Sequence, residues 1–333
     1  MSARLRIGLV FDLLGSAPPG GPPDADAEYE PEATVCALEA AVRAAGHEPL
    51  RLGNPHALLA AIGARSLPQI DAAWNIAEGY GTRNREAWAP VLLELAQIPA
   101  LGSDALTLSL SLDKAWTLDL VRAAGVPTAG HLSVASREAL VGAALPGAFP
   151  LFVKPRWEGT AKGIELRSRV ANARELGDAV ERVVRSYQQP ALVEPFLPGA
   201  EYTVTVIGND PPRALPVLQR ALELSTGIGV HAVERRDAPE ALAHHTPGTL
   251  TPELEGVLSA HALRAFAALR CCDFARIDFK LDARGEPRFL EINTLPTFAP
   301  DASFGILAEL MGQPLEHLLA EVLRGGLRRL GLE

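Results

Sequence analysis

Residues 275–293 read ARIDFKLDARGEPRFLEIN, and this stretch decides the fold. Polar and apolar side chains alternate on both sides of an Asp-x-x-Gly turn, which predicts two antiparallel strands joined in a hairpin. Because side chains repeat every two residues along a strand, Arg276 and Asp278 share one face, as do Glu291 and Asn293. Paired in this way, Asp278 and Glu291 can face the same side of the hairpin.

These converging polar groups leave two interpretations open. Two carboxylates with an amide oxygen form a hard-oxygen site of the kind that Mg²⁺ shares with ATP phosphates. Alternatively, Arg276 neutralises the acids in a cross-strand network that holds no ligand.

Upstream, residues 150–164 read PLFVKPRWEGTAKGI. We expect a strand that ends at Lys154, followed by a loop in which Gly159 and Gly163 let the backbone approach a phosphate closely. A surface hairpin with an incidental lysine is the alternative.

Residues 191–204 read ALVEPFLPGAEYTV, with one acid at the end of an expected strand and a second acid after a turn. Glu194 and Glu201, with Phe196 and Leu197 between them, suit an adenine held between apolar walls and a ribose hydroxyl. An edge strand whose acids face solvent is the alternative.

The first hundred residues alternate short apolar runs with amphipathic segments, which predicts a small parallel sheet with flanking helices. The expected strands cover residues 6–13, 48–52 and 72–75, and the expected helices cover residues 31–45, 56–64 and about 85–96. Later helices are expected at 113–124 and about 315–329.

Composition narrows the function classes. The chain has 333 residues, of which 48% are hydrophobic, and a net charge of −9, which argues against a nucleic-acid partner and favours small metabolites. Three cysteines, two of them adjacent, cannot form a disulfide framework, so we expect a reducing, cytoplasmic setting. No stretch approaches the roughly 18 apolar residues that a membrane span needs.

Lysine is rare in this chain. The 31 basic residues include only four lysines, namely Lys114, Lys154, Lys162 and Lys280. A compact ammonium at these positions suits contact with a phosphate as a point charge.

Taken together, these segments resemble the ATP-grasp superfamily and, within it, the D-alanine–D-alanine ligase family. The resemblance covers about residues 4–310 and also includes residues 74–79, 98–103 and 112–117. It implies an α/β fold, α+β in its ATP-grasp part, in which a Rossmann-like parallel sheet is followed by two ATP-grasp subdomains. The implied limits are 1–103 for the N-terminal domain, 104–190 for the central subdomain, and 191–333 for the C-terminal subdomain with the metal site and lid.

The resemblance also implies roles for individual residues. Lys114 and Lys154 would contact the nucleotide phosphates, and the loop from Gly159 to Gly163, with Thr160 and Lys162, would close over them. Adenine and ribose would be held by Glu194, Phe196, Leu197 and Glu201. Asp278, Glu291 and Asn293 would bind two Mg²⁺ ions, with Mn²⁺ able to substitute. Arg276 would stabilise the transferring phosphoryl group, and Glu32 would hold the ammonium group of the first substrate.

The activity implied is peptide-bond formation from a carboxylate and an amine through an acyl phosphate, with D-amino acids as substrates, in a cytoplasmic homodimer that supplies cell-wall precursor. Two alternatives stay open: a ligase for another carboxylate and amine, and a nucleotide-binding relative without turnover. The departures from the family pattern are Glu78, Thr297 and Ala302, together with a stretch from 219 to 251 that we expect to form a lid. In that lid, His231, Arg235 and Arg236 stand in for a familiar Tyr and Lys pair.

Overall fold

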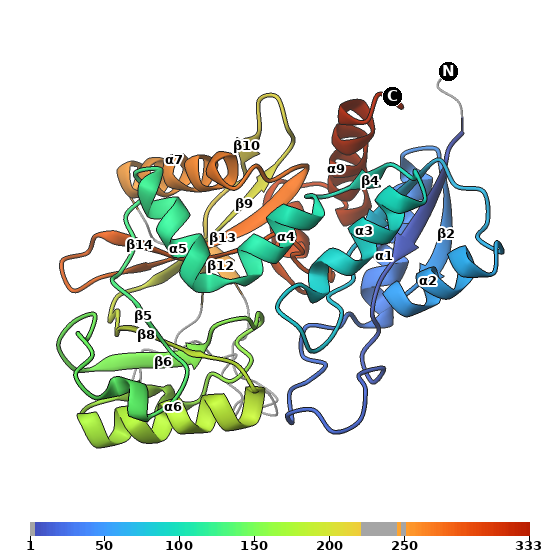
Figure 1. The fold of residues 1–333 in the computed structure, drawn as a ribbon. Coiled ribbons are helices and arrows are strands. Elements are labelled where there is room, and N and C mark those ends of the chain that lie inside the picture. The colour runs from blue at the N-terminus through green and yellow to red at the C-terminus, as the bar shows by residue number, and fades with distance from the viewer. Residues whose placement is uncertain (1–3, 221–244, 248–250) are drawn as a thin grey trace.

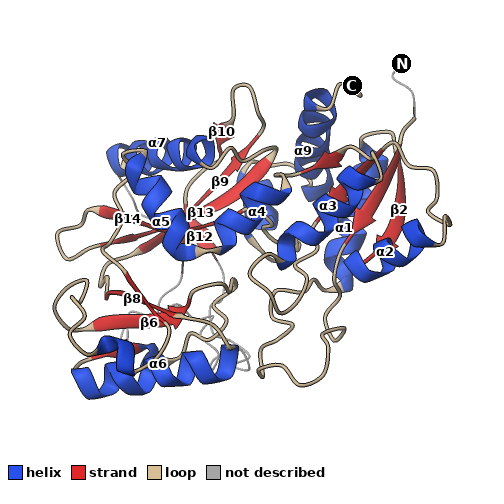
Figure 2. Ribbon diagram, in the orientation of Figure 1, coloured by secondary structure: helices blue, strands red, loops and turns tan. Residues whose placement is uncertain are grey.

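The computed structural model describes residues 4–220, 245–247 and 251–333. Three sheets organise the described chain, each covered by helices (Figure 1). In Figure 2, the first sheet lies at the right, the second at the lower left with a long helix beneath it, and the third above the second.

The N-terminal sheet is parallel and has the strand order β2-β1-β3-β4. Its elements are β1 Arg6–Val10, α1 Glu32–Ala44, β2 Glu48–Gly53, α2 Pro55–Gly63, β3 Ala72–Asn75, the 3₁₀-helix η1 Arg85–Ala87, α3 Trp88–Leu95 and β4 Ala100–Leu101. The expected parallel sheet with flanking helices is confirmed, and strand β3 has the predicted limits. Pro31 is the N-cap of α1.

The C-terminal helices return to this first sheet. Helices α8 Ser303–Leu310 and α9 Leu315–Arg329 share one hydrophobic core with α1 and β1. In that core Trp74, Phe274, Phe298 and Phe304 are almost completely buried. The segment between β14 and α8 is therefore anchored on the N-terminal sheet at its far end, which fixes residues 294–303 beside the N-terminal domain.

The second sheet is antiparallel, with the order β5-β8-β6-β7. Its elements are β5 Leu132–Val134, η2 Glu138–Leu140, β6 Leu151–Pro155, η3 Leu166–Ser168, β7 Arg169–Val170, α6 Ala173–Tyr187 and β8 Ala191–Pro195. The apolar face of α6 packs against β6 and β8 in a core of its own.

The third sheet is antiparallel, with the order β12-β11-β9-β13-β14 and with β10 paired to β9. Its strands are β9 Glu201–Ile207, β10 Arg213–Ala214, β11 Leu218–Arg220, β12 His245–Pro247, β13 Phe274–Leu281 and β14 Pro287–Asn293. Helices α4 Ala105–Leu112, α5 Lys114–Ala123 and α7 Pro252–Ala268 accompany it, and α5 and α7 share its core.

The sheets do not divide the chain at the expected limits. Strand β8 begins at residue 191 but belongs to the second sheet, because it pairs with both β5 and β6. Helix α5 lies in the segment expected to form the central subdomain, yet it packs on the third sheet. The domain limits thus stay a prediction, while the sheets show that the second one ends at residue 195 and the third begins at residue 201.

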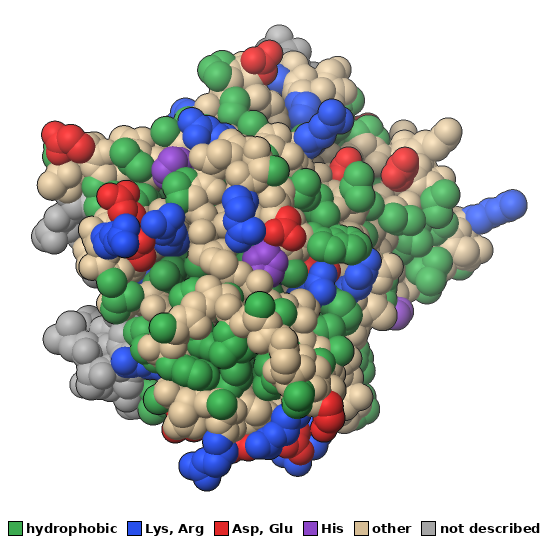
Figure 3. All heavy atoms as spheres, turned by 60° about the vertical axis from the view of Figure 1, so that its left-hand side comes forward, with side chains coloured by type: hydrophobic (Ala, Val, Ile, Leu, Met, Phe, Trp, Pro, Cys, Tyr) green, Lys and Arg blue, Asp and Glu red, His purple; other side chains and the backbone are tan. Residues whose placement is uncertain are grey.

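The surface shows two further features. Basic and acidic side chains are interspersed on the face in Figure 3, with no single basic patch across it. None of the helices within the described ranges is long and apolar enough to cross a bilayer.

Candidate active site

A first pocket lies between the second and third sheets and has a volume of about 120 Å³. The polar residues expected to serve a nucleotide, Lys114, Lys154, Lys162, Glu194 and Glu201, line it together. Its apolar walls include Phe152, Phe196, Leu197 and Leu290. The structure thus brings into one cavity groups that lie far apart along the chain.

Ion pairs connect the lysines of this pocket to its acids. Lys154 Nζ lies 2.7 Å from Glu194 Oε2, and Lys114 Nζ lies 2.9 Å from Glu291 Oε2. Burial opposes the charged form of Glu291, but Lys114 and Lys154 more than offset that penalty and hold its pKa at about 2. Both lysines of the first pocket therefore act on Glu291 of the hairpin.

The β13–β14 hairpin brings the predicted oxygen ligands together. Asp278 is paired with Glu291 and Arg276 with Asn293 across the two strands, so these side chains share a face. Asn293 Nδ2 donates to Asp278 Oδ2 at 3.4 Å, and Arg276 Nη2 lies 3.0 Å from the same oxygen. Thr203 Oγ1 donates to Asp278 Oδ1 at 2.6 Å, which orients that carboxylate.

This arrangement fits a divalent cation that also binds phosphate. The described residues contain no group of three or more His, Cys, Asp or Glu side chains that could hold a metal by themselves. Asp278 and Glu291 supply two carboxylates and Asn293 an amide oxygen, which is an incomplete set for an octahedral ion. Mg²⁺ usually completes such a set with phosphate oxygens and water. Arg276 also neutralises Asp278, so both interpretations of the hairpin describe part of what is seen.

A second, larger pocket of about 420 Å³ adjoins the first and shares Lys114, Ala161, Arg220 and Glu291 with it. Arg276, Asn293, Gly159 and Thr160 also line this second pocket. Its remaining wall comes from the N-terminal domain, from the end of α4 and from the segment that leads into α8. Glu291 of the hairpin therefore lies where the two pockets meet.

The glycine loop is tied to the N-terminal domain. Glu28 Oε1 accepts a hydrogen bond from the Gly159 amide at 2.5 Å, and its Oε2 lies 2.9 Å from Lys162 Nζ. Asp24 accepts one from the Gly163 amide at 2.9 Å. Thr160, at the tip, has a positive φ of 47°. Gly163 itself lines neither pocket, so its expected place over a phosphate is not seen.

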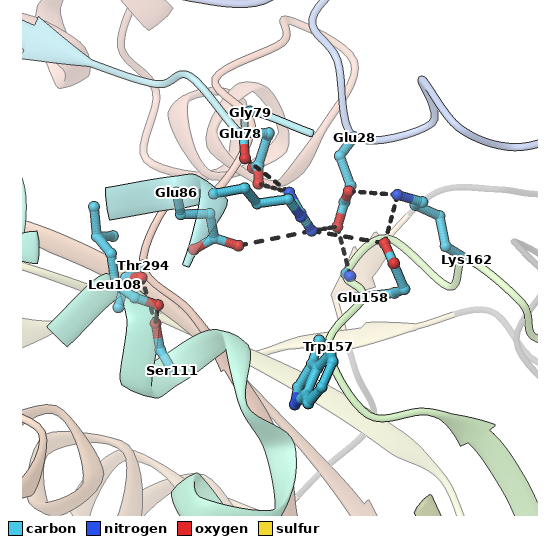
Figure 4. Close-up of polar contacts among 12 residues, drawn as sticks. Glu28, Glu78, Gly79, Glu86, Leu108, Ser111, Trp157, Glu158, Lys162 and Thr294 are labelled. Atoms are coloured by element: carbon cyan, nitrogen blue, oxygen red, sulfur yellow. Dashed lines mark hydrogen bonds and ion pairs between the residues drawn. The ribbon is translucent and has the colours of Figure 1, made fainter. Parts of the chain in front are cut away.

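A buried cluster of charges surrounds Arg85 at this junction (Figure 4). Four carboxylates lie within 4.0 Å of its guanidinium: Glu28 at 2.8 Å, Glu78 at 3.4 Å, Glu158 at 3.7 Å and Glu86 at 4.0 Å. In Figure 4, Glu28, Glu158 and Lys162 lie together on one side, and Glu78 and Glu86 lie across from them. We call these six residues the Arg85 cluster.

The acids of the Arg85 cluster differ in proton affinity. Burial alone would raise the pKa of Glu28, but Arg85 and Lys162 lower it to about 2. Burial raises the pKa of Glu86 to about 7, although Arg85 acts in the opposite direction. Burial, with repulsion from Glu86 and Glu28, also raises the pKa of Glu78. Arg85 and Lys162 thus do not fully compensate the negative charge of the four carboxylates in the cluster.

The expected position of Glu32 is wrong. Its side chain is 56% exposed on α1, pairs with Arg51, and lines neither pocket. The helix begins at Glu32, so this side chain lies on the face turned toward β2, whereas Glu28 and Glu30 precede the helix and line the second pocket. Sequence reasoning missed these two acids because the segment carries acids at positions 28, 30 and 32, and nothing in their spacing separates them.

The remaining predicted residues are the departures from the family pattern and three residues of the expected lid. Glu78, Thr297 and Ala302 line the second pocket, so the departures from the family pattern gather in it. His231, Arg235 and Arg236 lie outside the described residues.

Comparisons with known proteins find relatives over most of the chain. The family model described as D-ala D-ala ligase C-terminus matches residues 120–324. A D-alanine–D-alanine ligase of Carboxydothermus hydrogenoformans is 32% identical over 71% of this chain and 75% of its own length. An uncharacterised protein, y4sG of Sinorhizobium fredii, is 31% identical over 87% of this chain and 86% of its own.

Solved structures share the fold at lower identity. The D-alanine–D-alanine ligase of Bacillus anthracis complexed with ATP superposes with a TM-score of 0.69 at 19% identity, over 99% of both chains. The VanG D-Ala:D-Ser ligase of Enterococcus faecalis has a TM-score of 0.72 at 19% identity, over 97% of this chain and 100% of its own.

Proposed function

The chain belongs to the D-alanine–D-alanine ligase family, and on that basis we propose that it is an ATP-dependent ligase that joins a carboxylate to an amine. A D-alanyl dipeptide for cell-wall precursor synthesis is the product that the family favours. The observation that carries the proposal is the hairpin, whose Asp278 and Glu291 are paired on one face and whose Glu291 lines both pockets.

The reaction proceeds in two steps. The carboxylate oxygen first attacks the γ-phosphorus of ATP, which gives an acyl phosphate and ADP. The amine nitrogen then attacks the acyl carbon, phosphate leaves, and the ammonium protons lost on the way go to solvent or a base. Activation is needed because a carboxylate is a poor electrophile, and charge neutralisation supplies most of the catalysis in such transfers.

The side chains of this site suit those steps. Lys114 and Lys154 hold phosphate oxygens, and Arg276 stabilises the charge of the moving phosphoryl group. Phe196, Leu197, Glu194 and Glu201 hold adenine and ribose, and Gly159, Thr160 and Lys162 close over the phosphates. These roles are supported by the positions of the residues around the two pockets.

Asp278, Glu291 and Asn293 would hold Mg²⁺, with two ions expected and Mn²⁺ as a substitute. When bound, the metal supplies neutralisation of the phosphate charge. We further propose a cytoplasmic homodimer that acts on small molecules.

A second candidate is a ligase for another carboxylate and amine. Glu78, Thr297 and Ala302, the departures from the family pattern, all line the pocket meant for substrates, which favours it.

The test is phosphate release from Mg-ATP with single D- and L-amino acids and with pairs, followed by mass analysis of the product. The first panel contains D-alanine alone, D-serine alone and the two together. Release with formation of a D-alanyl dipeptide supports the first function, and release with other compounds alone supports the second. Glu291→Gln should abolish turnover, whereas the matched change Glu286→Gln in the exposed turn of the same hairpin should not. ATP binding without release from any pair would contradict the proposal.

A further inference from the structure

Two carboxyl groups in the wall of the second pocket take no part in the roles proposed for nucleotide and metal binding. Glu78 follows strand β3, Glu86 lies on η1, and both side chains line the pocket. Both contact Arg85 from one segment of the N-terminal domain, at 3.4 Å and 4.0 Å (Figure 4). We call Glu78 and Glu86 the acid pair.

A side-chain hydrogen bond joins the two members of the acid pair. Two carboxylates have no proton to share, so this bond forms only when one of the carboxyl groups is protonated. Burial and the charge of Glu86 raise the pKa of Glu78 well above its ordinary value, so Glu78 is the donor. Glu86 is the acceptor, and burial raises its pKa to about 7.

The surroundings of the acid pair allow Glu86 to change its protonation state near neutral pH. Arg85 and Lys114 favour its carboxylate, whereas burial and Glu28 oppose it. A group whose pKa lies close to the working pH transfers protons most effectively. The charged groups that act on the acid pair are Arg85, Lys114, Glu28 and Glu30.

Glu86 lies on the side of the second pocket that adjoins the hairpin. The 3₁₀-helix η1 packs against α4, whose last two residues also line the pocket. Lys114 acts on Glu86, and its Nζ lies 2.9 Å from Glu291 Oε2 of the hairpin. The acid pair therefore borders the space in which an amine would meet the acyl phosphate.

A separate observation indicates a polar ligand in this pocket. The hydroxyl oxygen of Ser303 is buried in the pocket wall and has no hydrogen-bond partner in the part of the chain that is described. Most buried polar atoms in proteins do have a partner. An amino-acid substrate in the pocket would provide one.

The ligation step needs a proton acceptor. An amine substrate enters at neutral pH as an ammonium ion, which has no lone pair for attack on the acyl carbon. The lysines and the arginine of the site already carry protons, and the carboxylates of Asp278 and Glu291 would be occupied by Mg²⁺. Glu86 is a carboxylate of the pocket that remains available for this task.

We propose that Glu86 is the general base of the ligation step and takes a proton from the ammonium group of the amine substrate, while the protonated Glu78 orients it. The proposal rests on the proposed function, because it assigns a further catalytic residue to the same reaction. The ammonium gives one proton to the Glu86 carboxylate, and the free amine nitrogen forms its bond to the acyl carbon. The bond from that carbon to the phosphate oxygen then breaks, and the leaving phosphate takes the second nitrogen proton.

The test compares an amino acid with a nucleophile that needs no base. Hydroxylamine is largely uncharged at neutral pH and traps an acyl phosphate as a hydroxamate. Native protein and Glu86→Gln receive Mg-ATP and the amino-acid pair that releases phosphate, D-alanine being tried first, with and without hydroxylamine. At pH 7 we expect the variant to form dipeptide at least ~100-fold more slowly and hydroxamate at close to the native rate. The control Glu94→Gln, on the exposed side of α3, should change neither product.

The pH dependence distinguishes a base from a residue that only shapes the pocket. Below the pKa of the amine, its uncharged fraction rises about tenfold for each pH unit. The deficit of Glu86→Gln in dipeptide formation should therefore shrink from pH 7 to pH 9. In the native protein, kcat/KM for the amine should fall below about pH 7, where Glu86 becomes protonated.

The outcomes separate this inference from the function on which it rests. Equal losses of dipeptide and hydroxamate, a deficit that stays constant from pH 7 to pH 9, or native activity in the variant overturns the inference and leaves the ligase standing. No phosphate release from the native protein with any pair overturns both. If the variant does not fold, the native pH profile decides, and a kcat/KM that does not fall below pH 7 overturns the inference.

Discussion

Replacing Arg85 by methionine removes the cation at the centre of the Arg85 cluster. Its side chain is only 3% exposed, and four carboxylates lie within 4.0 Å of it. Removing one partner of a buried ion pair leaves an uncompensated charge and costs about 3–5 kcal/mol. We therefore expect Arg85→Met to lower the free energy of unfolding by that amount and the melting temperature by roughly 5–15 °C.

The loss of stability in Arg85→Met should depend on pH in a defined direction. Without Arg85, the pKa values of Glu28, Glu78 and Glu86 in the folded state lie higher than in the native protein. A carboxyl group with a raised folded pKa contributes stability that is present below its unfolded pKa and is lost as pH rises through the folded value. The deficit of the variant should therefore grow from pH 5 to pH 8.

The assay is thermal unfolding by circular dichroism at both pH values, with Arg174→Met on the exposed start of α6 as the matched control. Arg85→Lys keeps the charge and should recover part of the loss. A change of less than about 1 °C, or a deficit that shrinks toward pH 8, would refute the reasoning about this cluster.

Three further changes test other parts of the account. Glu86→Gln removes a carboxyl group whose pKa is about 7. Thermal unfolding should therefore show that the variant is more stable than the native protein above pH 7 and equally stable at pH 5. An equal effect at both pH values speaks against the raised pKa. Lys154→Met should weaken Mg-ATP binding by roughly 10–100-fold in a calorimetric titration, and unchanged affinity would remove Lys154 from the nucleotide site. Gly305→Ala would put a Cβ 1.7 Å from the Pro300 oxygen and should lower the free energy of unfolding by about 1–3 kcal/mol. The control Gly256→Ala has open space around it and should not lower that free energy. Equal stability of the two variants argues against a tight approach at α8.

The hairpin could be predicted because its signal is local. Alternation around one turn sets which side chains share a face, and the observed pairing of Asp278 with Glu291 follows from it. The structure adds an irregularity after Asp278, where the register shifts and Phe279 pairs with Phe289. That detail depends on packing in the core and has no signature in the alternation.

The Arg85 cluster could not be predicted, because its members come from separate segments around residues 28, 78–86 and 158–162. Only the folded chain brings these segments together, and a single sequence carries no record of such contacts. The prediction for Glu32 was wrong for a related reason. Whether an acid faces the pocket or solvent depends on where α1 begins relative to the pocket wall.

The central claim is that the hairpin gathers divalent cations around a triphosphate. Calorimetric titration of ATP with and without Mg²⁺ tests it most directly, in the native protein and in Glu291→Gln. We predict that Mg²⁺ tightens ATP binding at least ~10-fold in the native protein and much less in the variant. Equal tightening in both proteins, or none in the native one, would contradict the claim.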